Sequence, residues 1–419
     1  MPALCSLFSE FERISGLSLN IAKTVFIPLW DTCAFANVRR LIQETCPPWK
    51  EICIESCGKY LGFFIGPGAV QRSWAKPLQK YEQRAQSWAS LNLGLFWTII
   101  AYRVFVASVL SFVMQLEVTP ADLRSRFDAI VRKMFPGPGT WATSDDLCNL
   151  QTWFGFPAQI DNPVSIALAA KLRVIAHVAP NCMTRSRELA FLHLEYGRRP
   201  FPDWHNRAYV RVLADAERLL AENGISVEKV QKMCLKPGHL SFQAHSRDAR
   251  VRVKLSKFRI SILPGYLDRI VAARFHLLSS WCAPRVVAVV FRTYWNGWVT
   301  TARMKSLFSK TGQARKFCLL GCGCEVDSLH HYLLCDVFWA FIRRNHGGGL
   351  GMATCLRTWE SALLLSSTLS DEDVARLAAG LYGLYKTLNS IRLPPHPLST
   401  VREAQERKTP CMESKSGWS

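Results

Sequence analysis

The apolar positions of the first 66 residues favour strands and turns, with two helices between them. Alternating apolar residues at 17–21 predict a half-buried strand or a strand-like turn that ends near Lys23. The segment 58–66 places an apolar run around a glycine and between two others, which predicts a tight hairpin. Helical spacing predicts an amphipathic helix over residues 3–15 and a second helix over Phe35–Glu44.

After Pro67-Gly68 the apolar spacing becomes helical. Pro77 suits the first turn of a helix that runs to about Leu91. The apolar run 91–114 is interrupted by Arg103 and several polar residues, so one or two buried helices are expected there instead of a membrane span. Thr119 is an expected N-cap for the next helix, which a Pro-Gly-Pro-Gly sequence ends.

Helical patterns also dominate the second half of the chain. Helices are expected over residues 164–178, 206–223 and 284–294, with two more before the tail. In the segment 247–259 cations alternate with apolar residues, and a strand here would place Arg252 and Lys254 on one face. The expected fold class is therefore α+β and predominantly α, with a β-hairpin near the N-terminus.

Charge points to a polyanionic partner. Lys and Arg total 52 against 32 Asp and Glu, a formal charge of +20. Nucleic acid is the commonest partner for such a surplus, and an anionic membrane surface is disfavoured because the cations are spread along the whole chain. Hydrophobic residues make up 49% and charged residues 20%, as in globular proteins.

With fifteen cysteines and no secretory signal pattern, reduced thiols and an intracellular location are expected.

A cysteine and histidine cluster forms the best candidate metal site. Two short chelating arms supply its four ligands, which are Cys318, Cys322, His331 and Cys335. Zinc prefers a tetrahedron of such ligands, and arms of this kind supply it at low entropic cost. Cys324 is an alternative to Cys322, and His330 is an alternative to His331. A structural Zn²⁺ ion is the expected cofactor.

Three segments resemble one protein family. Gly16–Thr24 matches the pattern G-L-x-[IL]-N-x-x-K-T, and Tyr60–Gly66 matches Y-L-G-x-x-[IL]-G. These are similar to the last palm motifs of non-LTR (LINE-type) retrotransposon reverse transcriptases. Asp327–Tyr332 resembles the Asp-Ser-[ILV]-x-His-Tyr core of the family's downstream cysteine and histidine motif, which favours His331 as the ligand. The three segments occur in the order that the family predicts.

The resemblance implies a C-terminal fragment of such an enzyme, starting just after its catalytic turn. The implied segments are the end of the palm (1–69), a helical thumb (70–160), a basic helical linker region (161–310), a zinc module of CCHC type (311–340), C-terminal helices (341–393) and a disordered tail (394–419).

The same resemblance implies roles for individual residues. Lys23 matches the lysine that approaches the incoming triphosphate, and the primer-grip hairpin matches Tyr60, Leu61 and Gly62. Lys80 and Arg84 lie four residues apart on one helix face, where a thumb would follow the phosphate backbone. For Lys23, an exposed lysine without a role is the alternative, and for the others a plain hairpin or a solvated face.

Catalysis by this chain alone is not expected. Polymerisation needs paired carboxylates that hold Mg²⁺, which only the full-length relative would bind. The one adjacent Asp pair, Asp145-Asp146, follows no apolar strand, so helix capping explains it better. The predicted function is that of a truncated reverse transcriptase (RNA-directed DNA polymerase) that binds RNA or DNA, with no membrane and no small-molecule substrate as partner. The alternatives are a non-enzymatic zinc-containing nucleic-acid-binding protein derived from such an element, and a polymerase whose remaining part lies elsewhere.

Overall fold

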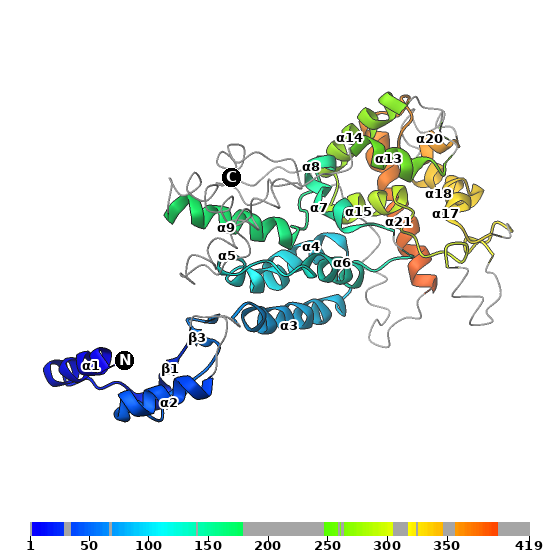
Figure 1. The fold of residues 1–419 in the computed structure, drawn as a ribbon. Coiled ribbons are helices and arrows are strands. Elements are labelled where there is room, and N and C mark those ends of the chain that lie inside the picture. The colour runs from blue at the N-terminus through cyan, green and yellow to red at the C-terminus, as the bar shows by residue number, and fades with distance from the viewer. Residues whose placement is uncertain are drawn as a thin grey trace. The chain divides into compact units, whose positions relative to one another are not determined.

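The described part of the chain is mostly helical, with a few short strands. The computed structural model describes residues 2–28, 35–66, 69–139, 141–178, 247–258, 260, 264–304, 317–323, 326–346 and 357–392. Within these described residues, helices and four short strands alternate before residue 66, and helices alone follow (Figure 1). The prediction of an α+β and predominantly α fold is confirmed at this level. The predicted helix over 206–223 and the predicted tail over 394–419 lie outside the described residues.

The chain forms two compact units that interleave along the sequence. Unit 1 comprises residues 1–136, 143–149 and 158–244, and unit 2 comprises 137–142, 150–157 and 245–419. Short segments around residues 137 and 150 therefore belong with the C-terminal part of the chain. The six segments implied by the family resemblance remain predictions.

Unit 1 begins with two helices and a parallel strand pair. Helix α1 spans Pro2–Ser15 and helix α2 spans Phe35–Thr45, as predicted. Strand β1 (Val25–Phe26) pairs with β2 (Cys53–Ile54). The segment 17–21 forms no strand: the chain enters a single 3₁₀ turn, η1 (Ile21–Lys23), which the Asn20 side chain caps by accepting a hydrogen bond from the Lys23 amide. A second 3₁₀ turn, η2, spans Pro47–Trp49.

The predicted hairpin is confirmed. Strand β3 (Gly58–Tyr60) and strand β4 (Phe63–Ile65) are antiparallel, and Tyr60 is directly opposite Phe63. Leu61 and Gly62 thus form a two-residue turn, and both have positive φ, +46° and +97°. That combination defines a type I′ turn, which matches the twist of the two strands. The closing glycine, Gly66, is at φ +133°, and a Cβ there would lie 2.3 Å from the Ser56 carbonyl oxygen.

Three long helices follow the hairpin within unit 1. Helix α3 covers Ala69–Ala89 and helix α6 covers Leu123–Met134, and the two lie side by side (Figure 1). Helix α9 covers Pro163–Val178. The expected start at Pro77 is wrong, because α3 begins eight residues earlier and holds this proline inside it. Neighbouring packing keeps the helix continuous although proline removes one backbone hydrogen bond.

The apolar segment 91–117 folds as consecutive short helices. They are α4 (Leu95–Ala101), the π-helix η3 (Tyr102–Val106), the 3₁₀ helix η4 (Ala107–Leu110) and α5 (Val113–Leu116). The π-helix places Tyr102 and Val106 in the core. Within the described residues, no helix has the length and apolar character to span a membrane.

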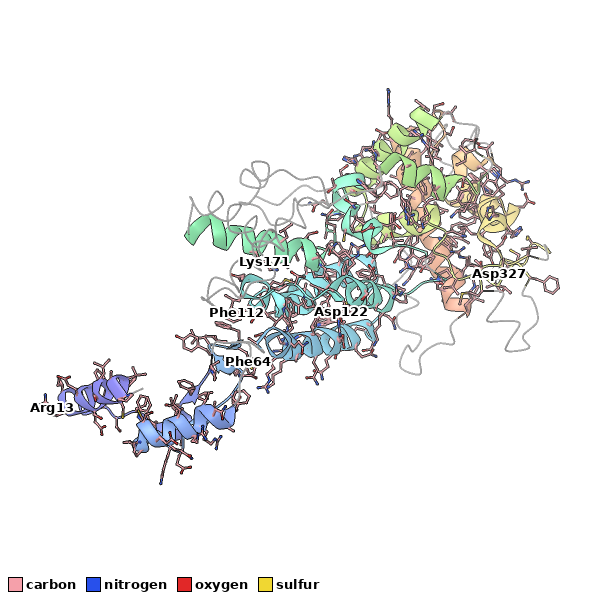
Figure 2. All side chains as sticks on the ribbon, in the orientation of Figure 1. Arg13, Phe64, Phe112, Asp122, Lys171 and Asp327 are labelled. Atoms are coloured by element: carbon pink, nitrogen blue, oxygen red, sulfur yellow. The ribbon has the colours of Figure 1, made fainter. Side chains whose placement is uncertain are left out.

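Polar side chains fix a helix start and a contact between segments in unit 1. Thr119 is not the N-cap of α6, because Asp122 holds that position and the Thr119 hydroxyl accepts a hydrogen bond from the ammonium of Lys171 at 2.7 Å. Lys171 is fully buried in this unit (Figure 2). Helix α7 spans Ser144–Cys148, and Asp146 forms a capping box with Thr143 at its start. The interpretation of the Asp145-Asp146 pair as a helix cap is therefore confirmed.

Unit 2 is a helical assembly around aromatic side chains. Its helices are α8 (Leu150–Phe154), α13 (Arg247–Leu255), α14 (Pro264–Trp281), α15 (Pro284–Tyr294), α17 (Leu329–Leu333), α18 (Asp336–His346), α20 (Trp359–Ala362) and α21 (Asp371–Arg392). Helix α15 packs against α21, and its Phe291 ring stacks on Trp295 at 4.3 Å between centroids. The Phe154 ring of α8 lies 4.9 Å from that of Phe275 on α14.

The basic segment that was expected as a possible strand is helix α13. In this helix Val251 is buried, whereas Val253 is 65% exposed. Val251 and Leu255, four residues apart, form its buried face, as helical spacing requires. The strand geometry inferred for Arg252 and Lys254 is therefore wrong.

Candidate metal centre

Two local structures bring the predicted ligands together. The first is a tight turn after Cys318, where the Gly321 amide donates to the Cys318 carbonyl at 3.1 Å and Gly321 has φ +75°. Only glycine adopts this conformation at low cost, so the turn directs Cys322 back toward Cys318. The second is helix α17, where the Ser328 hydroxyl accepts a hydrogen bond from the His331 amide and fixes the helix start.

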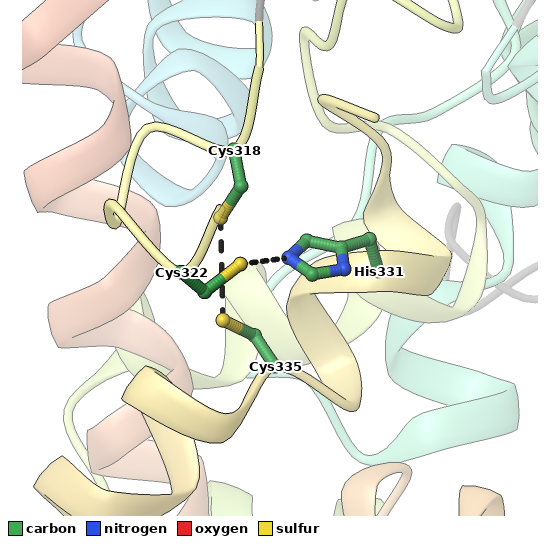
Figure 3. Close-up of side chains that lie close together, drawn as sticks. All are labelled: Cys318, Cys322, His331 and Cys335. Atoms are coloured by element: carbon green, nitrogen blue, oxygen red, sulfur yellow. Dashed lines mark hydrogen bonds between the residues drawn. The ribbon is translucent and has the colours of Figure 1, made fainter. Parts of the chain in front are cut away.

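The four ligand atoms form a compact cluster in unit 2. The sulfurs of Cys318 and Cys335 lie 4.0 Å apart, and the Cys322 sulfur lies 3.1 Å from Nε2 of His331 (Figure 3). All four ligand atoms lie within 4.8 Å of one another. Two sulfurs bound to one zinc ion at about 2.3 Å each are about 3.8 Å apart in a tetrahedron. The cluster can therefore hold a metal ion, and its ligand set and spacing are compatible with zinc.

Burial favours the neutral forms of two of the four ligand side chains. Burial raises the pKa of the Cys318 thiol, and burial lowers the pKa of His331. A neutral imidazole is ready to bind a metal, whereas a thiol must first lose its proton. A dication would supply the positive charge that stabilises the thiolates.

A buried polar network supports the two local structures that carry the ligands. The Tyr332 hydroxyl accepts a hydrogen bond from the Leu319 amide at 3.2 Å and donates to Asp327 at 2.7 Å. The other Asp327 oxygen accepts from the amide and the hydroxyl of Thr301 at 2.8 and 2.7 Å. Arg392, at the end of α21, forms an ion pair with Asp327. The network thus ties the ligand turn and α17 to two segments distant in sequence.

The alternative histidine has another role. Nε2 of His330 lies 3.1 Å from the carbonyl oxygen of Lys257, and its ring lies against the rings of Phe258 and Trp359. His330 is therefore turned away from the cluster, which contains His331 as the sequence motif indicated. The alternative ligand Cys324 lies outside the described residues.

The candidate nucleic-acid residues are in varied surroundings. Lys23 and Lys80 are exposed, as are the three residues of the hairpin tip. The Arg84 guanidinium donates to the Phe105 carbonyl at 2.7 Å, so it satisfies a backbone group of the π-helix η3. Arg252 is exposed, and the Lys254 ammonium donates to the Trp141 carbonyl at 2.8 Å.

The sequence interpretation assigned no role to four members of the polar network. Asp327 and Tyr332 lie inside the recognised motif, but no role was assigned to them. Thr301 and Arg392 lie far from it along the chain, and no local pattern marks them.

A comparison of the chain with protein-family models, with curated proteins and with solved structures finds no match. The fold and the site therefore define the protein only as a mainly helical protein with a Cys₃His candidate metal centre.

Proposed function

We propose that this chain is the palm end, the thumb and the zinc-bearing downstream region of a non-LTR retrotransposon reverse transcriptase, and that it binds RNA or DNA. The three motif matches in family order and the charge of +20 support the proposal. The residues of these motifs also have definite structural roles: Asn20 caps a turn, Gly62 and Gly66 take positive φ, and Asp327 and Tyr332 support the ligand cluster. Zinc in the cluster would hold the ligand turn against α17.

The proposal depends mainly on one observation, the backbone conformation and exposure of Leu61 at the tip of the hairpin. Leu61 occupies a position with φ +46°, where a residue other than glycine or asparagine costs about 1 kcal/mol. Its side chain is 75% exposed, so no burial within the chain offsets this cost. Strained, exposed apolar residues are typical of positions that contact a ligand. The family resemblance identifies that ligand as the end of a primer strand.

Polymerisation is not proposed for the chain by itself. The Asp146 carboxylate caps α7, and Asp145 forms an ion pair with Arg124 at 2.8 Å. Both carboxylates of the pair thus serve the helix and its neighbour, and a pair of metal ions would have to displace these contacts. The non-enzymatic nucleic-acid-binding protein derived from such an element is the second candidate, and these helix contacts favour it.

The Leu61→Asn variant tests the role of the hairpin. Asparagine suits the first central position of a type I′ turn, so the variant should fold at least as stably as the original chain. Fluorescence anisotropy would compare the binding of both chains to an RNA–DNA hybrid with a recessed 3′ end at several salt concentrations. We expect salt-dependent binding by the original chain and weaker binding by the variant.

An exposed leucine elsewhere in unit 1 supplies the control. Leu91→Asn makes the same chemical change just after α3, and it should leave binding unchanged. Equal affinities for the two variants would show that the hairpin is not part of the interface. Absence of any binding by the original chain would refute the proposed function. Nucleotide incorporation by this chain alone would refute the view that it lacks the polymerase carboxylates.

A further inference from the structure

Three cations from two segments distant in sequence lie near one loop of unit 2. Lys254 lies in the last turn of α13, Lys257 lies just after this helix, and Arg303 lies nine residues after α15. The loop contains Gly139 and Trp141, which belong to the segment of unit 2 that precedes α8. The three side chains will be called the Lys257 cluster.

A hydrogen bond places one of the three cations at the loop, and a short distance places a second beside it. The Lys254 ammonium donates to the Trp141 carbonyl at 2.8 Å. Nη2 of Arg303 lies 3.8 Å from the position that a Cβ on Gly139 would take. The loop therefore approaches a cation on each side, and glycine keeps the backbone accessible there.

Lys257 lies close enough to both cations for their charges to act on it. Burial, together with the positive charges of Lys254 and Arg303, lowers the pKa of Lys257 to about 7. Within the described part of the chain, neither Lys257 nor Arg303 forms an ion pair with an acidic side chain. The Phe258 ring, 5.1 Å from the Lys257 ammonium, offsets only a small part of the repulsion.

The fold prevents this repulsion from relaxing through backbone movement. Phe258 is 4% exposed, and its ring lies 5.0 Å from that of His330 and 5.4 Å from that of Trp359. The Lys257 carbonyl accepts a hydrogen bond from Nε2 of His330 at 3.1 Å. The residue next to the ligand His331 thus holds Lys257 in place.

We propose that Lys254, Lys257 and Arg303 bind the phosphate groups of a nucleic-acid backbone. A phosphate among these side chains would turn their mutual repulsion into attraction and accept several charge-assisted hydrogen bonds. Arg303 is exposed and Lys254 and Lys257 are half-buried, so a long polyanion can reach all three from one side. The choice of nucleic acid over free phosphate rests on the proposed function.

Chemical labelling tests whether phosphate occupies the cluster. At pH 7.5 about three quarters of a lysine with a pKa near 7 is deprotonated, against ~0.1% of an ordinary lysine, so an acylating reagent should modify Lys257 first. The negative charge of bound phosphate would favour the ammonium form of Lys257, which takes its proton from the solvent, and the phosphate would also cover this group. We expect an RNA–DNA hybrid to slow the labelling of Lys257, measured by mass spectrometry, but not the labelling of the exposed Lys386 on α21.

Neutral substitutions test the contribution to affinity. Lys257→Gln and Arg303→Gln should each lower the slope of log affinity against log salt by about 1. The matched control is Lys386→Gln, which removes the same charge from unit 2 and should leave the slope unchanged. Since Lys257→Gln also removes a repelled cation, its thermal midpoint should not fall.

The outcomes separate this inference from the proposed function. If the original chain binds the hybrid and the variants Lys257→Gln and Arg303→Gln retain its salt dependence, the Lys257 cluster is not part of the interface, although the proposed function stands. If inorganic phosphate slows the labelling and the hybrid does not, the cluster binds a free anion and the inference is wrong. If the original chain binds no nucleic acid, both fail.

Discussion

The buried carboxylate of Asp327 should be one of the most sensitive positions of unit 2. Its side chain is 1% exposed and accepts hydrogen bonds from the Tyr332 hydroxyl and from two donors of Thr301. The Asp327→Asn substitution keeps the shape but replaces one oxygen by a donor. Two of the donors around it would then face an amide N–H₂. Arg392, 11% exposed at its side chain, would keep a buried charge but lose its negatively charged partner.

The expected cost is that of breaking a buried ion pair from one side. Removing one partner of such a pair costs about 3–5 kcal/mol, because the remaining charge stays desolvated. We therefore expect Asp327→Asn to lower the free energy of unfolding of unit 2 by about 3–5 kcal/mol. Native-state hydrogen exchange of the whole chain, loaded with zinc, measures this for the amides of α17 and α21 separately from unit 1.

Arg392→Met provides the matched comparison. Asp327 would keep its three other hydrogen bonds, so the loss should be smaller than for Asp327→Asn. The double variant should cost less than the sum of the two single ones, since neither charge is then left alone. A loss below about 1 kcal/mol for Asp327→Asn would contradict the inference that this carboxylate is ionised and essential to the network.

The pH dependence of this effect has a defined sign. Burial alone would raise the pKa of Asp327, but the hydrogen bonds from Tyr332 and Thr301 and the charge of Arg392 outweigh it and lower the pKa below its ordinary 3.8. The stabilisation by the ionised Asp327 is therefore present in full above its ordinary pKa of 3.8. It is lost as the pH falls through the lower pKa that Asp327 has in the folded chain. The difference between the original chain and Asp327→Asn should shrink only in strong acid.

Three further substitutions test the candidate metal centre and the helix packing. The purified chain should hold one zinc ion per molecule by elemental analysis, and His331→Ala should lose it; full retention would show that the ligand set is different. On α21, a Cβ at Gly380 would lie 2.2 Å from Cδ1 of the buried Ile342, whereas Gly383 has open space around it. At Gly380→Ala an overpacking cost of about 1–3 kcal/mol is opposed by a gain of up to about 1 kcal/mol in helix propensity. Gly383→Ala has the same gain without the clash, so it should be the more stable of the two variants. Denaturant titration measures the difference, and equal effects would place the close contact elsewhere.

Short-range signals in the sequence predicted the local elements well. Helix α15 begins at Pro284 and ends at Tyr294, as expected from a proline at the first helical position followed by a dense apolar face. The hairpin was predictable because its glycines mark the turn and its end. The two arms of the candidate metal centre were predictable from their spacing, since both arms are local structures.

The errors come from contacts that no local pattern records. Pro77 marks a helix start by propensity, but α3 extends before it because Ser73 and Trp74 are buried there. The alternation in 247–259 fits a strand and a helix alike, because Val251 and Leu255 are also four residues apart. Thr301 and Arg392 join the metal centre only through the tertiary fold.

The interleaving of the two units has a consequence for how the protein is made. Trp141 and Phe154, which belong with unit 2, leave the ribosome before any of the helices α13 to α21 exist. Until α14 and α15 have been synthesised, these aromatic rings lack their final partners Phe291 and Phe275 and remain available to chaperones or to other nascent chains. A protein cut once between its units would suffer the same deficit permanently, so expression of the C-terminal half should succeed only when the peptide that carries these two rings is supplied with it.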